Sequence, residues 1–112
     1  MDKRTLEALK ASIDKWEKNS RVRKAENAKV GSTHSPLCQI YNRAEEKYSE
    51  RCLGCPVAEF ADRRWCEGTP YVDAEYELRD WRDGISSNGK DFRADARAEV
   101  EFLKSLLPEG EQ

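Results

Sequence analysis

The four cysteines constrain the fold of this chain more than any other feature. They are Cys38, Cys52, Cys55 and Cys66, spaced as C-x13-C-x2-C-x10-C within 112 residues. A CxxC pair with two further cysteines is a donor set used by tetrahedral Zn²⁺ sites, which contribute folding energy directly. The spacing therefore predicts a structural four-cysteine zinc site at the centre of the fold, although the longer separations differ from those of a standard zinc finger.

Several other states of these cysteines stay open. A [4Fe-4S] cluster also takes four cysteines and is often marked by Cys followed by Pro, as in Cys55-Pro56. We favour zinc because no cofactor motif or partner cysteine indicates electron transfer. The cysteines could instead be buried thiols or form disulfides. Thioredoxin-type chemistry at Cys52 and Cys55 is a further option, but the βαβ context expected around such a motif is missing. His34, the single histidine, is a weaker candidate for an additional ligand near Cys38.

Length and composition predict a single domain over residues 1–112 with a thin core. Hydrophobic and charged residues each make up 38% of the chain, so a metal would add stability that apolar burial alone supplies poorly. The N-terminus is highly charged and apolar runs are short, so we expect neither a signal peptide nor a membrane span. We expect a cytoplasmic protein, and a reducing cytoplasm favours metal ligation over disulfides. No internal repeat is apparent.

Apolar residues at helical spacing predict an all-α fold of about four to five helices. The first helix covers about residues 3–19, with an apolar stripe that ends at Trp16. The last helix covers about residues 91–107, with Asp91 as its N-cap and Pro108 closing it. The simplest packing pairs these terminal helices, so that each buries the stripe of the other. Between them we expect three helices, over about residues 36–50, 56–64 and 70–83, the last with a stripe from Tyr71 to Ile85.

Two of the cysteines fall at helix starts that prolines mark. Ser35-Pro36 predicts an N-cap followed by proline in the first helical turn, which also contains Cys38. Cys55 precedes Pro56 and would be an N-cap itself, where the helix dipole lowers a thiol pKa. Gly54 allows the sharp turn that points two sulfurs at one ion. The predicted metal site is therefore a hub that joins several helix starts.

The sequence gives no support for an enzyme and little for nucleic-acid binding. It contains no Gly-rich phosphate loop, nucleophile elbow or paired His and carboxylate motif. Residues 1–30 hold nine Lys/Arg against five Asp/Glu, whereas the remainder holds eleven against seventeen, which is a weak footprint for phosphate binding. We expect the aromatic residues to pack against helices rather than stack on bases, namely Trp16, Tyr41, Trp65 and Trp81.

Four segments carry a resemblance to a protein family. They are Leu6 to Trp16 (LEALKASIDKW), Pro36 to Tyr41 (PLCQIY), Cys52 to Ala58 (CLGCPVA) with Cys66 to Tyr71 (CEGTPY), and Ala98 to Pro108 (AEVEFLKSLLP). Together they resemble a group of small, largely uncharacterised proteins encoded by tailed bacteriophages and prophages. Members often have C-P-L-C where this chain has Ser35-Pro36-Leu37-Cys38. If that cysteine is a metal ligand in the relatives, His34 or Ser35 would have to replace it in this chain. If it is not a ligand, the four cysteines of this chain are enough to bind the metal, and we prefer this second interpretation.

The resemblance and the acidic body together lead to a functional hypothesis. We expect a non-enzymatic phage-type accessory protein whose metal fixes the central loops, so that an acidic helical surface binds a host or phage protein as an inhibitor or modulator. The alternatives are a metal-stabilised nucleic-acid-binding module that uses the basic face of residues 3–29, and an iron-sulfur or redox protein. Monomer and homodimer are both compatible with the charge pattern.

Overall fold

The computed structural model describes residues 1–31, 34–43, 45–61, 66–85 and 88–111. Over these ranges the chain forms five α-helices, two 3-10 helices and no strand, which confirms the predicted all-α fold. None of the described helices is long and apolar enough to cross a membrane. The elements in order are α1 Lys3–Asn19, η1 Ala25–Asn27, α2 Pro36–Tyr41, η3 Tyr48–Glu50, α3 Pro56–Ala61, α4 Pro70–Arg82 and α5 Lys90–Ser105.

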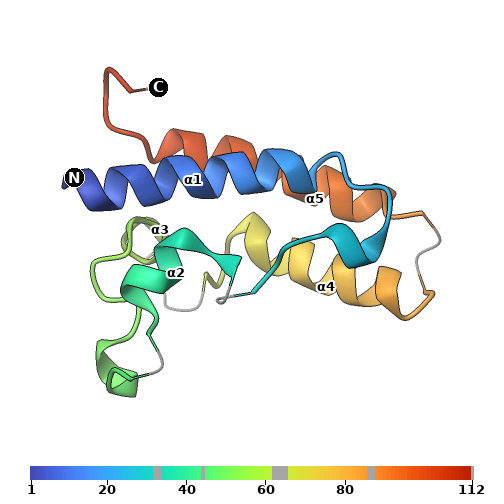
Figure 1. The fold of residues 1–112 in the computed structure, drawn as a ribbon, viewed down its shortest axis with the longest axis horizontal. Helices are drawn as coiled ribbons and strands as arrows, with labels where there is room; N and C mark the ends of the chain where they lie inside the picture. Colours follow the sequence, from blue (N-terminus) through green and yellow to red (C-terminus); the bar gives the residue numbers. More distant parts are fainter. Residues whose placement is uncertain (32–33, 44, 62–65, 86–87, 112) are drawn as a thin grey trace.

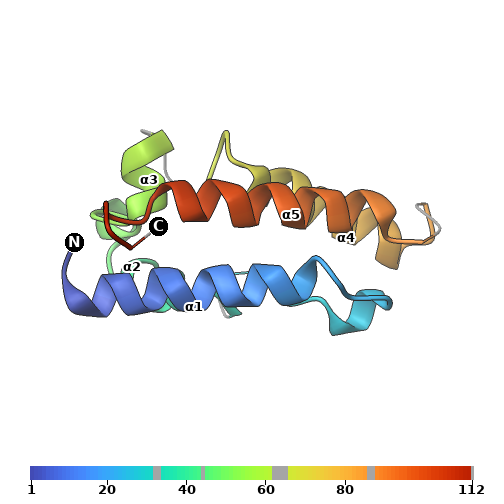
Figure 2. The same ribbon diagram turned by 90° about the horizontal axis from the view of Figure 1, so that it is seen from above.

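The two terminal helices pair as predicted. Helices α1 and α5 run antiparallel, side by side, in both views (Figures 1 and 2). The Trp16 ring on α1 lies 6.4 Å from the Phe92 ring on α5, centroid to centroid, and both side chains are almost fully buried. Around this pair the facing stripes bury four more large side chains, namely Leu9, Ile13, Val100 and Leu103.

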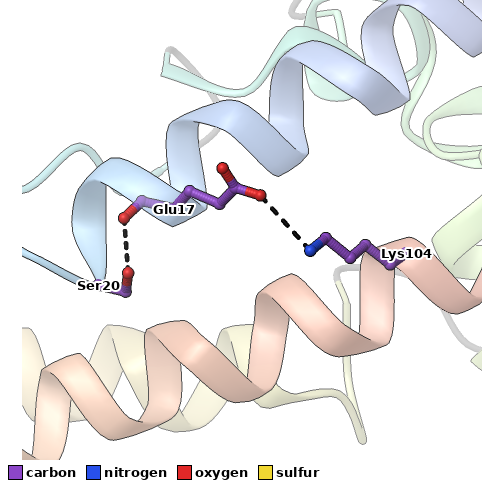
Figure 3. Close-up of polar contacts among 3 residues, drawn as sticks. All are labelled: Glu17, Ser20 and Lys104. Carbon is purple, nitrogen blue, oxygen red and sulfur yellow. Dashed lines mark hydrogen bonds and ion pairs between the residues drawn. The ribbon is translucent and has the colours of Figure 1, made fainter.

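A polar contact between the two helices adds little to this apolar packing. Glu17 on α1 and Lys104 on α5 form an ion pair at 3.6 Å, and the Ser20 hydroxyl donates to the Glu17 carbonyl at 2.6 Å (Figure 3). Both charged side chains are substantially exposed, so the pair contributes at most about 1 kcal/mol. The stability of the helix pair therefore depends on apolar burial.

Helix α4 packs along α5 and completes the core. Ala74 and Leu78 are buried on its inner side, and Trp81 lies 6.1 Å from the Phe92 ring. This confirms the helix predicted over residues 70–83. Ile85, expected to close the same stripe, lies beyond the end of the helix and is 75% exposed.

The predicted N-cap of α5 is wrong by two residues. Gly89 is the N-cap, with φ of 72°, whereas Asp91 lies in the first turn of the helix. A Cβ atom on residue 89 would lie 2.6 Å from the Trp81 ring, so a side chain is excluded there. The packing of Trp81 against this turn, which helical periodicity does not reveal, therefore determines where α5 begins.

The middle of the chain is less helical than predicted. The helix expected over residues 36–50 ends at Tyr41, and only Tyr48–Glu50 returns to a 3-10 turn. The Tyr41 carbonyl accepts a hydrogen bond from the Cys52 backbone N–H instead of continuing the helix. Helix α3 is described over Pro56–Ala61, and the remainder of the helix predicted to about residue 64, with Trp65, for which we expected a packing role, lies outside the described residues.

Two phenylalanines provide a matched test of this core. Phe92 is 1% exposed, whereas Phe60 is 67% exposed. We expect Phe92→Ala to lower the free energy of unfolding by about 3–5 kcal/mol, because it leaves a cavity between α1, α4 and α5. Phe60→Ala should cost about 1 kcal/mol or less, through its edge contact with Phe102. Urea unfolding followed by circular dichroism measures both values, and equal costs would contradict the core described here.

Candidate functional site

Two of the four cysteines lie in an uncommon backbone conformation. Cys52 and Cys66 have φ of 67° and 61°, and among the described residues no other non-glycine has a positive φ. A left-handed conformation costs a residue with a side chain roughly 1–2 kcal/mol. Such strain persists only where the surrounding structure enforces it, and it is concentrated at functional sites.

The same turn surrounds both of these cysteines. Two residues after each cysteine is a glycine with positive φ, and the N–H of the third residue donates to the cysteine carbonyl, at 3.2 Å in the first turn and 3.3 Å in the second. A proline then begins a helix, α3 in one case and α4 in the other. The two segments are Cys52-Leu53-Gly54-Cys55-Pro56 and Cys66-Glu67-Gly68-Thr69-Pro70.

This repeated turn was not predicted from the sequence. Its signature, C-x-G-[C/T]-P, is only five residues long, and the fourth position differs between the copies. Thr69 occupies in the second turn the place that Cys55 holds in the first, and its hydroxyl donates to the Cys66 carbonyl at 2.6 Å. The second turn therefore supplies one thiol where the first supplies two.

The other two cysteines lie at helix starts, as predicted. The Cys38 N–H donates to the Ser35 hydroxyl at 3.2 Å, which confirms Ser35 as the N-cap of α2. The Cys55 carbonyl accepts from the Glu59 N–H at 2.9 Å, which places Cys55 at the N-cap of α3. The expected lowering of the Cys55 pKa is wrong in sign: burial raises this pKa and outweighs the nearby N–H groups of Val57 and Ala58.

The repeated turn helps to position the thiols in a part of the chain whose helices are short. Helices α2 and α3 have six residues each, too few to be stable without tertiary support. In each turn the left-handed cysteine and the following glycine reverse the chain, and a proline immediately begins the next helix. The local backbone thus sets the direction of Cys52 and Cys66, while helix caps set that of Cys38 and Cys55.

Three of the four predicted ligands line one small cavity. This cavity has a volume of about 30 Å³ and its walls include Cys38, Cys55 and Cys66; we call it the thiol cavity. Cys52 is buried but is not part of the cavity wall, and His34 is exposed and lies outside it. Helices α1 and α5 supply three polar residues of the wall, Ser12, Lys15 and Glu99.

The cysteines are close enough to influence each other electrostatically. Burial raises the pKa of Cys66, and the charges of Cys38, Cys55, Glu99 and Cys52 raise it further. All four cysteines are free thiols. Over the described residues, however, no group of three or more His, Cys, Asp or Glu side chains is arranged to hold an ion. The four-cysteine zinc site therefore stays a prediction, with its candidate ligands gathered but not closed around a common point.

Two buried polar groups on the cavity wall have no hydrogen-bond partner in the described part of the chain. They are the Glu99 Oε1 atom and the Ser12 hydroxyl, each on a residue that is 3% exposed. Burial raises the pKa of Glu99 to about 7, and the charge of Lys15 opposes that rise. Buried polar atoms are almost always satisfied in proteins, so two unpartnered atoms on one cavity wall are unusual.

Sequence analysis missed these wall residues, although the helical spacing contains a signal for them. Glu99 lies three residues after Ala96 and four before Leu103, on the buried stripe of α5. Ser12 falls between Leu9 and Trp16 on the stripe of α1 in the same manner. A polar residue on an apolar stripe indicates a buried polar site, but only the packing of the helices shows that both face one cavity.

No protein-family model, curated protein or solved structure matches the chain. The resemblance to phage and prophage proteins accordingly stays a prediction.

Glu99 should make the stability of the metal-free protein depend on pH. Its pKa is raised from 4.5 to about 7, so the folded state binds the proton more tightly than the unfolded state. Stability is therefore lost as the pH rises from the unfolded to the folded pKa, by roughly 3 kcal/mol in total. We expect urea unfolding of chelator-treated wild type to show this loss between about pH 4 and pH 7.5. Glu99→Gln should remove most of the slope, and an unchanged slope would contradict the burial of this carboxylate.

Proposed function

We propose that this chain is a non-enzymatic helical protein that binds a basic surface of a protein partner through a cluster of carboxylates, with its four cysteines holding a structural zinc ion. The observation that carries the binding part is a set of acidic residues on neighbouring helices. They are Asp73, Glu77 and Asp80 of α4 with Asp91 and Asp95 of α5, and we call them the acidic face.

The packing of α4 along α5 supports treating these five residues as one surface. Partial burial raises the pKa of Glu77, and the charges of Asp91, Asp95, Asp80 and Asp73 raise it further. The pKa of Asp95 is raised in the same way, first by burial and then by Asp73 and Asp91. Carboxylates from both helices are therefore within electrostatic range of each other.

Ion pairs with described residues do not neutralise the negative charge of the acidic face. None of its five carboxylates forms an ion pair with a described lysine or arginine, whereas Glu17, Asp14 and Glu111 elsewhere do. Like charges on one helix cost a few tenths of a kcal/mol per pair. A basic partner surface would remove this repulsion, and complementary fields also accelerate association.

This charge distribution favours a protein partner over a nucleic acid. A phosphate backbone would be repelled by the acidic face, and two of the lysines on α1, Lys10 and Lys18, already pair with carboxylates. The resemblance to phage and prophage proteins favours a host or phage protein in the bacterial cytoplasm as that partner, inhibited or modulated by the contact.

The thiol cavity and the repeated turn support the zinc part of the proposal. The ion would be held by Cys38, Cys52, Cys55 and Cys66, three of which line the thiol cavity while Cys52 is buried outside its wall. Thiolate sulfur suits Zn²⁺, and the bound ion would supply structural cross-linking of α2, α3 and α4. A [4Fe-4S] cluster would use the same donors and is the alternative that metal analysis separates.

Metal content of protein purified without oxygen tests the cysteine site. We expect one zinc per chain in wild type, and loss of that zinc with a several kcal/mol decrease in the free energy of unfolding for Cys66→Ser. His34→Ala is the control and should retain zinc, because His34 is exposed and lies outside the cavity. Iron with sulfide would indicate the cluster instead, and protein that binds neither would refute the site.

Charge reversal tests the acidic face. We expect Glu77→Lys/Asp91→Lys to weaken capture of a stoichiometric protein partner from bacterial lysate by roughly ten-fold, and capture by wild type to weaken as salt is added. Glu26→Lys/Glu109→Lys changes the net charge equally at exposed positions outside the face and is the control. The stability of the first variant should not decrease, because repulsion is relieved. Equal loss in both variants, or no partner for wild type at moderate salt, would count against this surface.

A further inference from the structure

Lys15 differs from its neighbouring lysines on α1. Lys10 and Lys18 point outward and pair with Glu111 at 2.7 Å and with Asp14 at 3.0 Å. Lys15 instead forms part of the thiol cavity wall, with its Nζ atom 5.0 Å from the centroid of the Trp16 ring. No carboxylate of the described residues pairs with it, so this partly buried ammonium group lacks a direct counter-ion.

The charges that Lys15 does experience come from the cavity. The Cys38 and Cys66 thiols and the Glu99 carboxylate belong to the same cavity wall as Lys15. Four thiolates around a divalent zinc ion leave two uncompensated negative charges, and burying these without a nearby cation is costly. Groups outside the ligand shell commonly supply such compensation.

We infer that Lys15 is the charge-compensating residue of the cysteine site, with its ammonium group stabilising the metal-bound thiolates of Cys38 and Cys66. This inference rests on the zinc site proposed above and adds a residue that carries none of the ligand atoms. Lys15 would not bind the ion itself. It would act on the bound thiolates through its charge, from its position on α1 in the cavity wall.

Glu99 should act in the opposite direction. Its carboxylate also belongs to the wall of the cavity that Cys38, Cys55 and Cys66 line. In its ionised form Glu99 therefore opposes formation of the thiolates that Lys15 favours. Substitution of Lys15 and substitution of Glu99 should therefore change metal affinity in opposite directions. This difference distinguishes a charge effect from general damage to the core.

The test is zinc affinity measured by competition with a chromogenic chelator at slightly alkaline pH. We expect Lys15→Met to weaken zinc binding about 10–100-fold, while Lys18→Met, the same substitution one helical turn away, leaves it unchanged. Glu99→Gln should bind zinc as tightly as wild type or a few-fold tighter. Cobalt substitution provides a second readout, since an unchanged thiolate-to-metal absorption band in Lys15→Met shows that the ligands themselves are retained.

The outcomes separate this inference from the proposal beneath it. Failure of wild type to bind zinc overturns the metal site itself. Zinc binding by wild type with equal affinities for Lys15→Met and Lys18→Met leaves the site in place and overturns the role of Lys15. Equal weakening in Lys15→Met and Glu99→Gln also overturns it, because loss of polar packing rather than loss of a cation would then explain the effect.

Discussion

The antiparallel contact between α1 and α5 is the interaction on which the rest of the structure depends. It buries the largest side chains of the core, including Trp16 and Phe92, and Trp81 of α4 packs against the same Phe92 ring. The two helices also contribute polar residues to the wall of the thiol cavity, Ser12 and Lys15 from one and Glu99 from the other. Because this wall needs both helices at once, the cavity is a product of the apolar pairing.

The sequence predicted the parts of the fold that local periodicity controls. Residues 3–19 and 70–83 carry long apolar stripes, and both helices occur within one residue of their predicted bounds. The prediction of a helix over residues 36–50 was too long, because the Tyr41 carbonyl accepts a hydrogen bond from the Cys52 N–H, eleven residues later, instead of one from the next helical turn. The predicted start of α5 was wrong for a similar reason, since the position of the Trp81 ring leaves no room for a side chain at Gly89. Contacts between segments decide these boundaries, and one sequence does not display them.

The candidate site likewise has a part that the sequence predicts and a part that depends on contacts between segments. Its donor residues could be chosen from the spacing of the cysteines, because ligand chemistry restricts which side chains qualify. Its electrostatic environment could not, because Lys15 and Glu99 lie 84 residues apart (15 and 99) and meet only through the helix pair. The sign error for the Cys55 pKa has this origin as well: a helix start is visible in the sequence, whereas the burial that outweighs it is a property of the packed chain.

The thiol cavity and the acidic face are physically linked through the second turn. Cys66 belongs to the cavity wall, and only Glu67, Gly68 and Thr69 separate it from the first residue of α4. The Thr69 N–H and hydroxyl both bond to the Cys66 carbonyl, so the turn transmits the position of the thiol to the helix start. Asp73, one helical turn further on, begins the acidic face. A metal ion bound by Cys66 would therefore fix the end of α4 from which these carboxylates extend, and that places the structural and binding parts of the proposed function on a single continuous element.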